Sequence, residues 1–170
     1  SHPTPLRNHY QVLYLDFSRI LGNIDVLEEK FNSYCCDQLN DFIDTYRDDY
    51  PKERVEEFLR SDDHGQKLNL LLNMSRKYNQ PLYLIIDEYD NFTNIVLSEQ
   101  GEAIYHNMTH ASGFYREVFK KFKGMFERIF LTGVSPVTLD DLTSGFNIGW
   151  NISMAPELDK MLGFSTEDVR

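Results

Sequence analysis

Three short apolar runs along the chain have the length and composition of β-strands. The first has its apolar core at Val12–Leu15, the second is Leu82–Ile86, and the third is Arg128–Thr132. Each run ends at polar or turn-forming residues, which is typical of a strand buried inside a sheet. We therefore predict three strands, the first two of them buried.

Between these runs, apolar residues recur at steps of three and four, the spacing that puts them on one side of an α-helix. The spacing predicts a long helix from Ile24 to Tyr46 and a short helix after Pro51. Two more helices are predicted, from about Gly65 to Tyr78 and from Phe114 to Phe126. In the short helix, three residues are expected to face inward: Val55, Phe58 and Leu59.

The order strand, helices, strand, helix, strand is typical of an α/β fold with a mainly parallel sheet between helices on both faces. Asn151–Met154 is predicted as a further short strand, and Ser165 as the N-cap of a helix that begins near the end of the sequence. We interpret residues 1–170 as a single partial domain, with 155–170 as the start of a truncated C-terminal part.

Size and composition indicate one globular domain. The chain has 170 residues, of which 41% are hydrophobic, enough for a sizeable core. No apolar run is long enough to span a membrane, and the first residues lack the apolar segment of a signal peptide. The only cysteines, Cys35 and Cys36, do not have the spacing of a zinc site. We expect a reduced, cytoplasmic protein.

The net charge of -10 is concentrated in one part of the chain. Residues 25–63 contain 13 acidic and 5 basic residues, within a segment, 25–80, that is predicted to be helical. A surface this acidic argues against a strong nucleic-acid footprint. Most of these charges are expected on helix faces exposed to water.

Each predicted strand ends in polar side chains. In a parallel sheet, the carboxyl ends of the strands share one edge, and ligands bind outside that edge. The sequence therefore predicts a site there, built from three pairs of residues: Asp16 and Ser18, Asp87 and Glu88, Thr132 and Ser135.

An apolar strand that ends in Asp-Glu has the Walker B pattern. Asp87 is the candidate ligand of Mg²⁺, which prefers hard oxygen donors. Glu88 is the candidate general base that orients or deprotonates an attacking water. Thr132, on a neighbouring strand, is placed to hold that water or to contact the terminal phosphate. Asp90 lies further along and is expected to be a cap or turn residue.

The phosphate-binding loop that normally accompanies Walker B is not in this sequence. A P-loop reads G-x-x-x-x-G-K-[ST], and its backbone N–H groups and lysine hold the phosphates. No glycine of the chain is followed by lysine. Without such a loop, Mg²⁺–ATP loses most of its binding contacts.

Five segments resemble the AAA-ATPase-like domain family of bacterial and archaeal proteins. They are VLYLDFS, LYLIIDEYDN, GFYREVFKKFK, RIFLTGVSPVTLDDLTSGFNI and MLGFSTEDV. The resemblance covers nearly the whole chain and implies an AAA-type P-loop NTPase core, with Mg²⁺ and ATP as cofactors of the parent protein. In this family, a PD-(D/E)XK nuclease-like domain often follows.

The resemblance also implies residue roles. Asp87 matches the Walker B metal position, Glu88 the catalytic glutamate and Thr132 the sensor-1 position. Asp16 lies in a block without an assigned role and, with Ser135, is a candidate cofactor-binding residue. Family members carry Walker A upstream of the strand matched by Val12–Leu15, where this sequence has none. We therefore expect this chain alone not to bind or hydrolyse ATP well, even if its parent does.

The strand order of AAA-type sheets, 5-1-4-3-2, implies that the three predicted strands are contiguous and that the P-loop strand is absent from one edge. That edge, at Ile129–Leu131, would be open. An open apolar edge invites pairing with another strand. We expect self-association there, or a displaced C-terminal strand.

Two other functions are consistent with the sequence. Asp16 and Asp87 could share one Mg²⁺ in a phosphoryl-transfer site of another kind. Alternatively, the acidic helices could recruit a basic partner in a protein-interaction module without catalysis. His106 and His110 are four residues apart, as zinc ligands on a helix can be, but no third ligand is evident.

Overall fold

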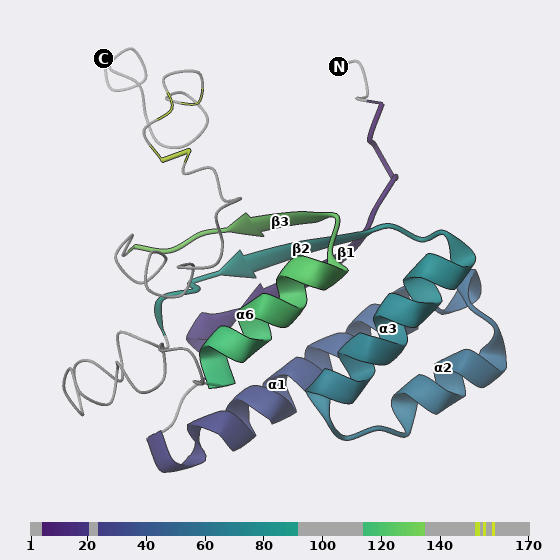
Figure 1. Ribbon diagram of the computed structural model, residues 1–170, viewed down its shortest axis with the longest axis horizontal. Coiled ribbons are helices and arrows are strands. Elements are labelled where there is room, and N and C mark those ends of the chain that lie inside the picture. Colours follow the sequence, from purple (N-terminus) through teal and green to yellow (C-terminus); the bar gives the residue numbers. More distant parts are fainter. Residues whose placement is uncertain are drawn as a thin grey trace.

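A computed structural model describes residues 5–20, 24–91 and 114–134, and also Ile152, Ser153, Ala155 and Leu158 (Figure 1). The three predicted strands and four predicted helices are all present, close to the expected positions. The strands are β1 (Gln11–Asp16), β2 (Leu82–Asp87) and β3 (Arg128–Leu131). The helices are α1 (Ile24–Thr45), α2 (Lys52–Leu59), α3 (His64–Tyr78) and α6 (Phe114–Met125), with 3-10 turns η1 (Phe17–Arg19) and η2 (Arg47–Asp49).

The strands form one parallel sheet in the order β1-β2-β3, with β2 in the centre. The predicted contiguity of the three strands is confirmed. The register pairs Gln11 with Leu82 and Asp16 with Asp87. On the other side of β2, Tyr83 pairs with Arg128. Among the described residues, β3 pairs with β2 alone.

The described helices lie on one face of the sheet (Figure 1). Right-handed crossovers that advance in one direction place their helices on the same face, and the order β1-β2-β3 advances in this way. In β1, Leu13 and Leu15 point to this face and are buried, whereas Val12 and Tyr14 are 38% and 46% exposed. Helices on both faces of the sheet, as expected from the sequence, would bury every side chain of this strand. The prediction of a fully buried first strand is therefore wrong for Val12 and Tyr14.

The core lies between the sheet and the helices. Aliphatic side chains of β1 and β2 pack against an aromatic group contributed by α1, α2 and α6: Phe31, Phe42, Phe58, Phe119 and Phe122. The short helix α2 buries Val55 and Phe58 as predicted, but Leu59 is exposed, contrary to expectation.

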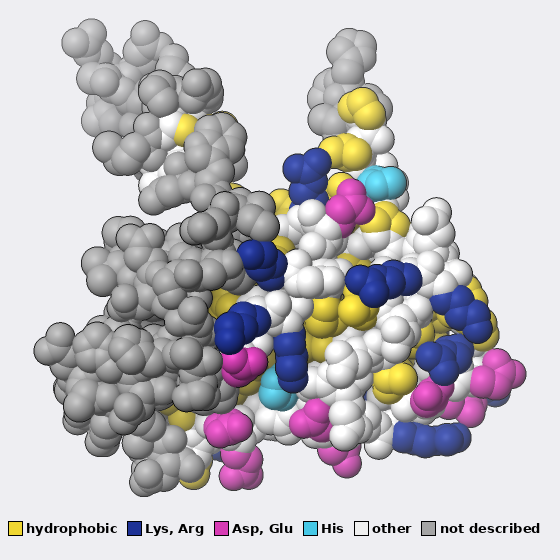
Figure 2. Space-filling model, viewed as in Figure 1, with side chains coloured by type: hydrophobic (Ala, Val, Ile, Leu, Met, Phe, Trp, Pro, Cys, Tyr) yellow, Lys and Arg dark blue, Asp and Glu magenta, His cyan; other side chains and the backbone are white. Residues whose placement is uncertain are grey.

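The acidic residues of α1 from Glu28 onward lie on the surface, as predicted, and so do those of α2. Asp41 and Asp44 on α1 are exposed, and so are Glu53 and Glu56 on α2. Figure 2 shows acidic side chains along the lower edge of the view, over these two helices.

Two tyrosines, Tyr34 in α1 and Tyr46 directly after α1, cover part of the outer edge of β1. The N–H of Val12 donates to the Tyr46 hydroxyl over 3.0 Å. The N–H of Asp16 donates to the Tyr34 hydroxyl over 2.7 Å. An edge strand normally leaves such groups free to pair with another chain. In β1, two of these backbone N–H groups are instead hydrogen-bonded to tyrosine hydroxyls.

Some expectations differ from the structure or lie outside the described residues. Ile152 and Ser153 are not in a strand, because the N–H of Ala155 donates to the Ile152 carbonyl over 3.0 Å and forms a turn. His106, His110 and Ser165 are outside the described ranges. Both cysteines are free and buried, and burial raises the pKa of the Cys35 thiol. Within the described residues, no helix is both long and apolar enough to cross a membrane.

Candidate functional site at the carboxyl edge of the sheet

Three of the predicted site residues lie side by side where the strands end. Asp16 is the register partner of Asp87. Thr132 directly follows Leu131, which pairs with Ile86, so Thr132 is level with Asp87 on the next strand. The sheet therefore brings together one residue from the end of each strand.

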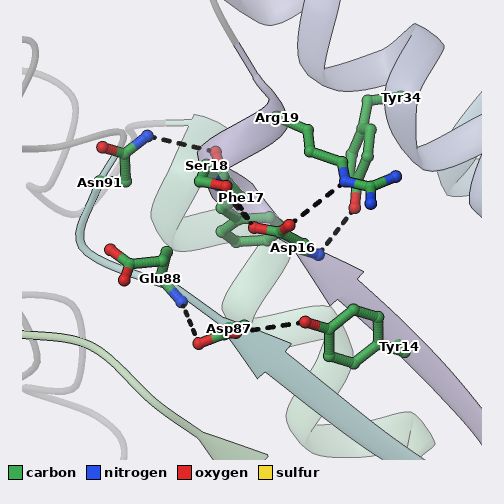
Figure 3. Close-up of polar contacts among 9 residues, drawn as sticks. All are labelled: Tyr14, Asp16, Phe17, Ser18, Arg19, Tyr34, Asp87, Glu88 and Asn91. Carbon is green, nitrogen blue, oxygen red and sulfur yellow. Dashed lines mark hydrogen bonds and ion pairs between the residues drawn. The ribbon is translucent and has the colours of Figure 1, made fainter.

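The Asp87 carboxylate is held by three donors from three segments. Its Oδ1 accepts a hydrogen bond from the Thr132 hydroxyl and another, of 3.0 Å, from the Glu88 N–H. Its Oδ2 accepts from the Tyr14 hydroxyl over 3.2 Å (Figure 3). These bonds fix the orientation of the carboxylate at the end of the central strand.

The same contacts favour the ionised form of Asp87. The Thr132 hydroxyl lowers the pKa of the Asp87 carboxyl most strongly; partial burial opposes this, and the Tyr14 hydroxyl and the Glu88 N–H add to the lowering. The net pKa lies below the ordinary value for Asp. Desolvation and the bond to Asp87 raise the pKa of Tyr14, so its hydroxyl keeps the proton that it donates.

Glu88 differs from Asp87 in both backbone and side chain. Its φ is 52°, in the left-handed region that residues other than glycine and asparagine seldom adopt. Its carboxylate is half-buried and makes no hydrogen bond or ion pair within the described part of the chain. Figure 3 shows it pointing away from the Asp87 carboxylate.

Asp16 has a structural role at the end of β1. It caps η1: its Oδ1 accepts from the N–H of Ser18 over 3.0 Å and from the Ser18 hydroxyl over 2.6 Å. Its Oδ2 forms an ion pair of 3.2 Å with Arg19, whose side chain is mostly exposed. Asn91 connects this turn to the next strand end, since its Nδ2 donates to the Phe17 carbonyl over 3.4 Å.

A second carboxylate, Asp90, lies beneath the site. It is fully buried, and the N–H of Val134 donates to both of its oxygens, over 3.1 and 3.2 Å. Gly133 lets these turns approach, because an added Cβ there would lie 2.5 Å from both Asp90 Oδ1 and Tyr89 Cε1. Asp90 is a turn residue, as predicted, but its burial was not foreseen.

Two contacts of the site were not predicted from the sequence. Tyr14 lay inside an apolar run and was assigned to the core. Its separation of two residues from Asp16 was the available signal, because side chains two apart on a strand share a face. The contact between Asp90 and Val134 joins residues far apart in sequence and left no local signal. Ser135, a predicted cofactor-binding residue, is outside the described ranges.

The oxygen donors at this edge fit a magnesium ion that is shared with phosphate. Within the described residues, no group of three or more His, Cys, Asp or Glu is arranged to hold a metal by itself. Mg²⁺ commonly binds through one or two carboxylates together with water and substrate phosphates. Asp87 provides such a carboxylate, with Glu88 and Thr132 next to it.

The whole edge falls inside a family match. The model of the family described as "Predicted AAA-ATPase" matches residues 1–143 of this chain. That range includes β1, β2 and β3 and all the site residues described above. No curated protein and no solved structure matches the chain.

Proposed function

The chain belongs to the predicted AAA-ATPase family, and from that membership we propose that the carboxyl edge is the metal-binding and water-activating side of an ATP-hydrolysis site. One observation carries the proposal. Asp87, at the end of the central strand, is oriented by three donors and has a lowered pKa, while the adjacent Glu88 carboxylate is unpaired within the described residues.

Each residue has a separate task in this proposal. Asp87 binds Mg²⁺ directly or through water, and the bound ion supplies charge neutralisation on the phosphate oxygens. Glu88 accepts the proton of the attacking water. Thr132 donates its hydroxyl to Asp87, which fixes the carboxylate next to the position of the water.

The phosphate side of the site needs contacts that these residues do not provide. The sequence contains no G-x-x-x-x-G-K-[ST] loop, and backbone N–H groups of such a loop give most of the phosphate binding energy. We propose that this chain by itself binds Mg²⁺–ATP weakly, and that hydrolysis requires a P-loop in addition.

Calorimetric titration of Mg²⁺–ATP tests this division of tasks. The unaltered chain is expected to bind weakly, with small heats that do not reach saturation. Asp87→Ala is expected to bind more weakly still. In a protein in which a P-loop segment precedes this chain, we expect tight binding and hydrolysis. There Glu88→Gln should keep binding and lower kcat by about 10²–10⁴-fold, the contribution of a general base.

Two results would contradict the proposal. One is tight binding of Mg²⁺–ATP by the unaltered chain, lost in Asp87→Ala, which would mean that the edge forms a nucleotide site without a P-loop. The other is full kcat in Glu88→Gln when a P-loop is present, which would exclude Glu88 as the base.

A further inference from the structure

Two turns at the carboxyl edge are joined to each other. The turn after β2 is Glu88–Asn91, and the segment after β3 is Thr132–Val134. Their backbones meet directly, because the N–H of Tyr89 donates to the carbonyl of Thr132 over 3.1 Å. The N–H of Thr132 in turn donates to the carbonyl of Ile86, over 2.9 Å. The two turns therefore continue the pairing of β2 and β3 beyond the strands.

Asp90 makes the side-chain connection between these turns. Its carboxylate is fully buried and accepts the N–H of Val134 with both oxygens. A carboxylate taken out of water is costly unless donors are directed at it. The side chain of Val134 is 82% exposed, so burial of that side chain does not hold the segment in place. The bond to Asp90 holds the segment at Val134, two residues beyond the backbone bonds of Thr132.

The fit between the turns is tight. A Cβ at position 133 would lie 2.5 Å from Asp90 Oδ1 and from Tyr89 Cε1, closer than Cβ contacts occur. The turn after β2 and the segment after β3 are therefore in close contact at Gly133.

The contacts between the two turns hold the backbone of Glu88 in place. Its left-handed φ of 52° is unfavourable for glutamate, and such conformations persist only where the surroundings hold them. Its carbonyl accepts the N–H of Asn91 over 3.0 Å, which closes the turn. The next two residues, Tyr89 and Asp90, are the ones attached to the segment after β3.

We propose that Asp90 is a positioning residue that holds Glu88 and Thr132 in a fixed relation across the two strand ends. The importance of Asp90 for catalysis rests on the proposed function, in which Glu88 accepts the proton of the attacking water and Thr132 fixes the Asp87 carboxylate. Asp90 itself contacts neither substrate nor metal in this proposal. It acts through the backbone of the turn that carries Glu88.

The test uses nuclear magnetic resonance on the full 170-residue chain with two variants of Asp90. Asp90→Ala removes the acceptor, and Asp90→Asn keeps an oxygen of the same size. In Asp90→Ala, hydrogen exchange of the Val134 amide should accelerate roughly tenfold more than that of Leu13 in β1. The chemical shifts of Glu88 should also move away from left-handed values. Asp90→Asn should restore both.

A matched control separates this local effect from general destabilisation. Leu71→Ala removes a fully buried side chain of α3, far in sequence from both turns. It should accelerate exchange at Val134 and Leu13 to a similar extent and leave the Glu88 shifts unchanged. If Asp90→Ala behaves like Leu71→Ala, Asp90 is an ordinary core residue and the proposal is overturned.

These measurements need no nucleotide, so they remain decisive if the ATPase proposal fails. If a protein with a P-loop does not hydrolyse ATP, Asp90 has no role in catalysis. The hydrogen-exchange result then still decides whether Asp90 joins the two turns. Where hydrolysis occurs, Asp90→Ala should lower kcat roughly 10²-fold with little change in KM, as expected for a misplaced base. An unchanged kcat would overturn the positioning role.

Discussion

At the residue scale, the site depends on two acids with opposite surroundings. Asp87 is fixed by hydrogen bonds to both of its oxygens, whereas Glu88, the next residue, has a free carboxylate within the described part of the chain. The two side chains also differ in backbone, since Glu88 alone of the two has a left-handed φ. The Asp-Glu pattern predicted which residues would be at the edge. It carried no information about their separate surroundings, which come from Tyr14 on β1 and Thr132 directly after β3.

Gly133 gives a prediction at this scale. Gly133→Ala should destabilise the fold by about 1–3 kcal/mol, the usual cost of overpacking, because the added methyl group would overlap Asp90 and Tyr89. Urea unfolding measures the difference.

Gly124 is the matched control for that substitution. A Cβ there meets nothing within 4 Å, and the residue lies in α6. Gly124→Ala should therefore be neutral or stabilising by up to about 1 kcal/mol. A Gly133→Ala variant as stable as Gly124→Ala would show that the turns are less tightly packed than described.

At the element scale, helices and strands were predictable because their hydrophobic periods are local properties of the sequence. Exposure was harder to predict. Val12 and Tyr14 lie in an apolar run, yet they are exposed because the described helices all pack against the other face. Strand order and crossover direction decide which face of the sheet a helix covers. The apolar run that contains Val12 and Tyr14 specifies neither of them. The tyrosine caps on β1 likewise depend on how α1 lies along the strand.

The edge caps lead to a second prediction. Replacing Tyr34 and Tyr46 by Phe leaves the N–H groups of Asp16 and Val12 without their acceptors. Each loss should lower the free energy of unfolding by about 0.5–1.5 kcal/mol. The double variant should also self-associate more than the unaltered chain, measured by light scattering. Tyr78→Phe, on α3, is the control, and equal behaviour of the control and the double variant would refute the capping role.

The junction of α1 and α3 gives a prediction about pH. His64 is half-buried, and its Nδ1 lies 2.7 Å from Asn32 Oδ1. Burial lowers the pKa of His64 below its ordinary 6.5; Lys121 lowers it further, and Asp63 and Glu28 oppose this. The unfolded chain then binds a proton more readily than the folded chain as the pH falls through 6.5. Stability should therefore decrease from about pH 7.5 to about pH 5.5.

Urea unfolding across that pH range, with two histidine variants, checks this prediction. His64→Gln should lose the part of the pH dependence that comes from this site, where each unit of pKa difference is worth about 1.4 kcal/mol. His9→Gln replaces an exposed histidine and should keep the full dependence. If His64→Gln follows the same pH curve as the unaltered chain, His64 does not couple folding to protonation.

At the scale of the whole molecule, the two edges of the sheet differ. Tyrosine hydroxyls cover part of the β1 edge, whereas β3 has no second strand beside it among the described residues. The strand order was predicted through the family resemblance, since the apolar runs alone do not specify which strand is central. The difference between the two edges depends on Tyr34 and Tyr46, about which the family resemblance gives no information.

The difference between edges predicts self-association through β3. The mass in solution should rise with protein concentration, because unpaired strand edges pair readily. Phe130→Lys places a charge on that strand and should shift the protein toward the monomer. Val26→Lys, which replaces an exposed apolar residue of α1, should not. A monomeric mass at every concentration would contradict the prediction.

The central claim is that a metal–nucleotide complex binds at the end of β2, and paramagnetic broadening by Mn²⁺–ATP tests it most directly. Mn²⁺ accepts the same oxygen ligands as Mg²⁺, and broadening reports even weak binding. We predict that the amide signals of Asp87, Glu88 and Thr132 broaden first, and that Asp87→Ala abolishes the effect while Asp16→Asn preserves it. Broadening centred on the acidic helices α1 and α2, with none at the end of β2, would contradict the account.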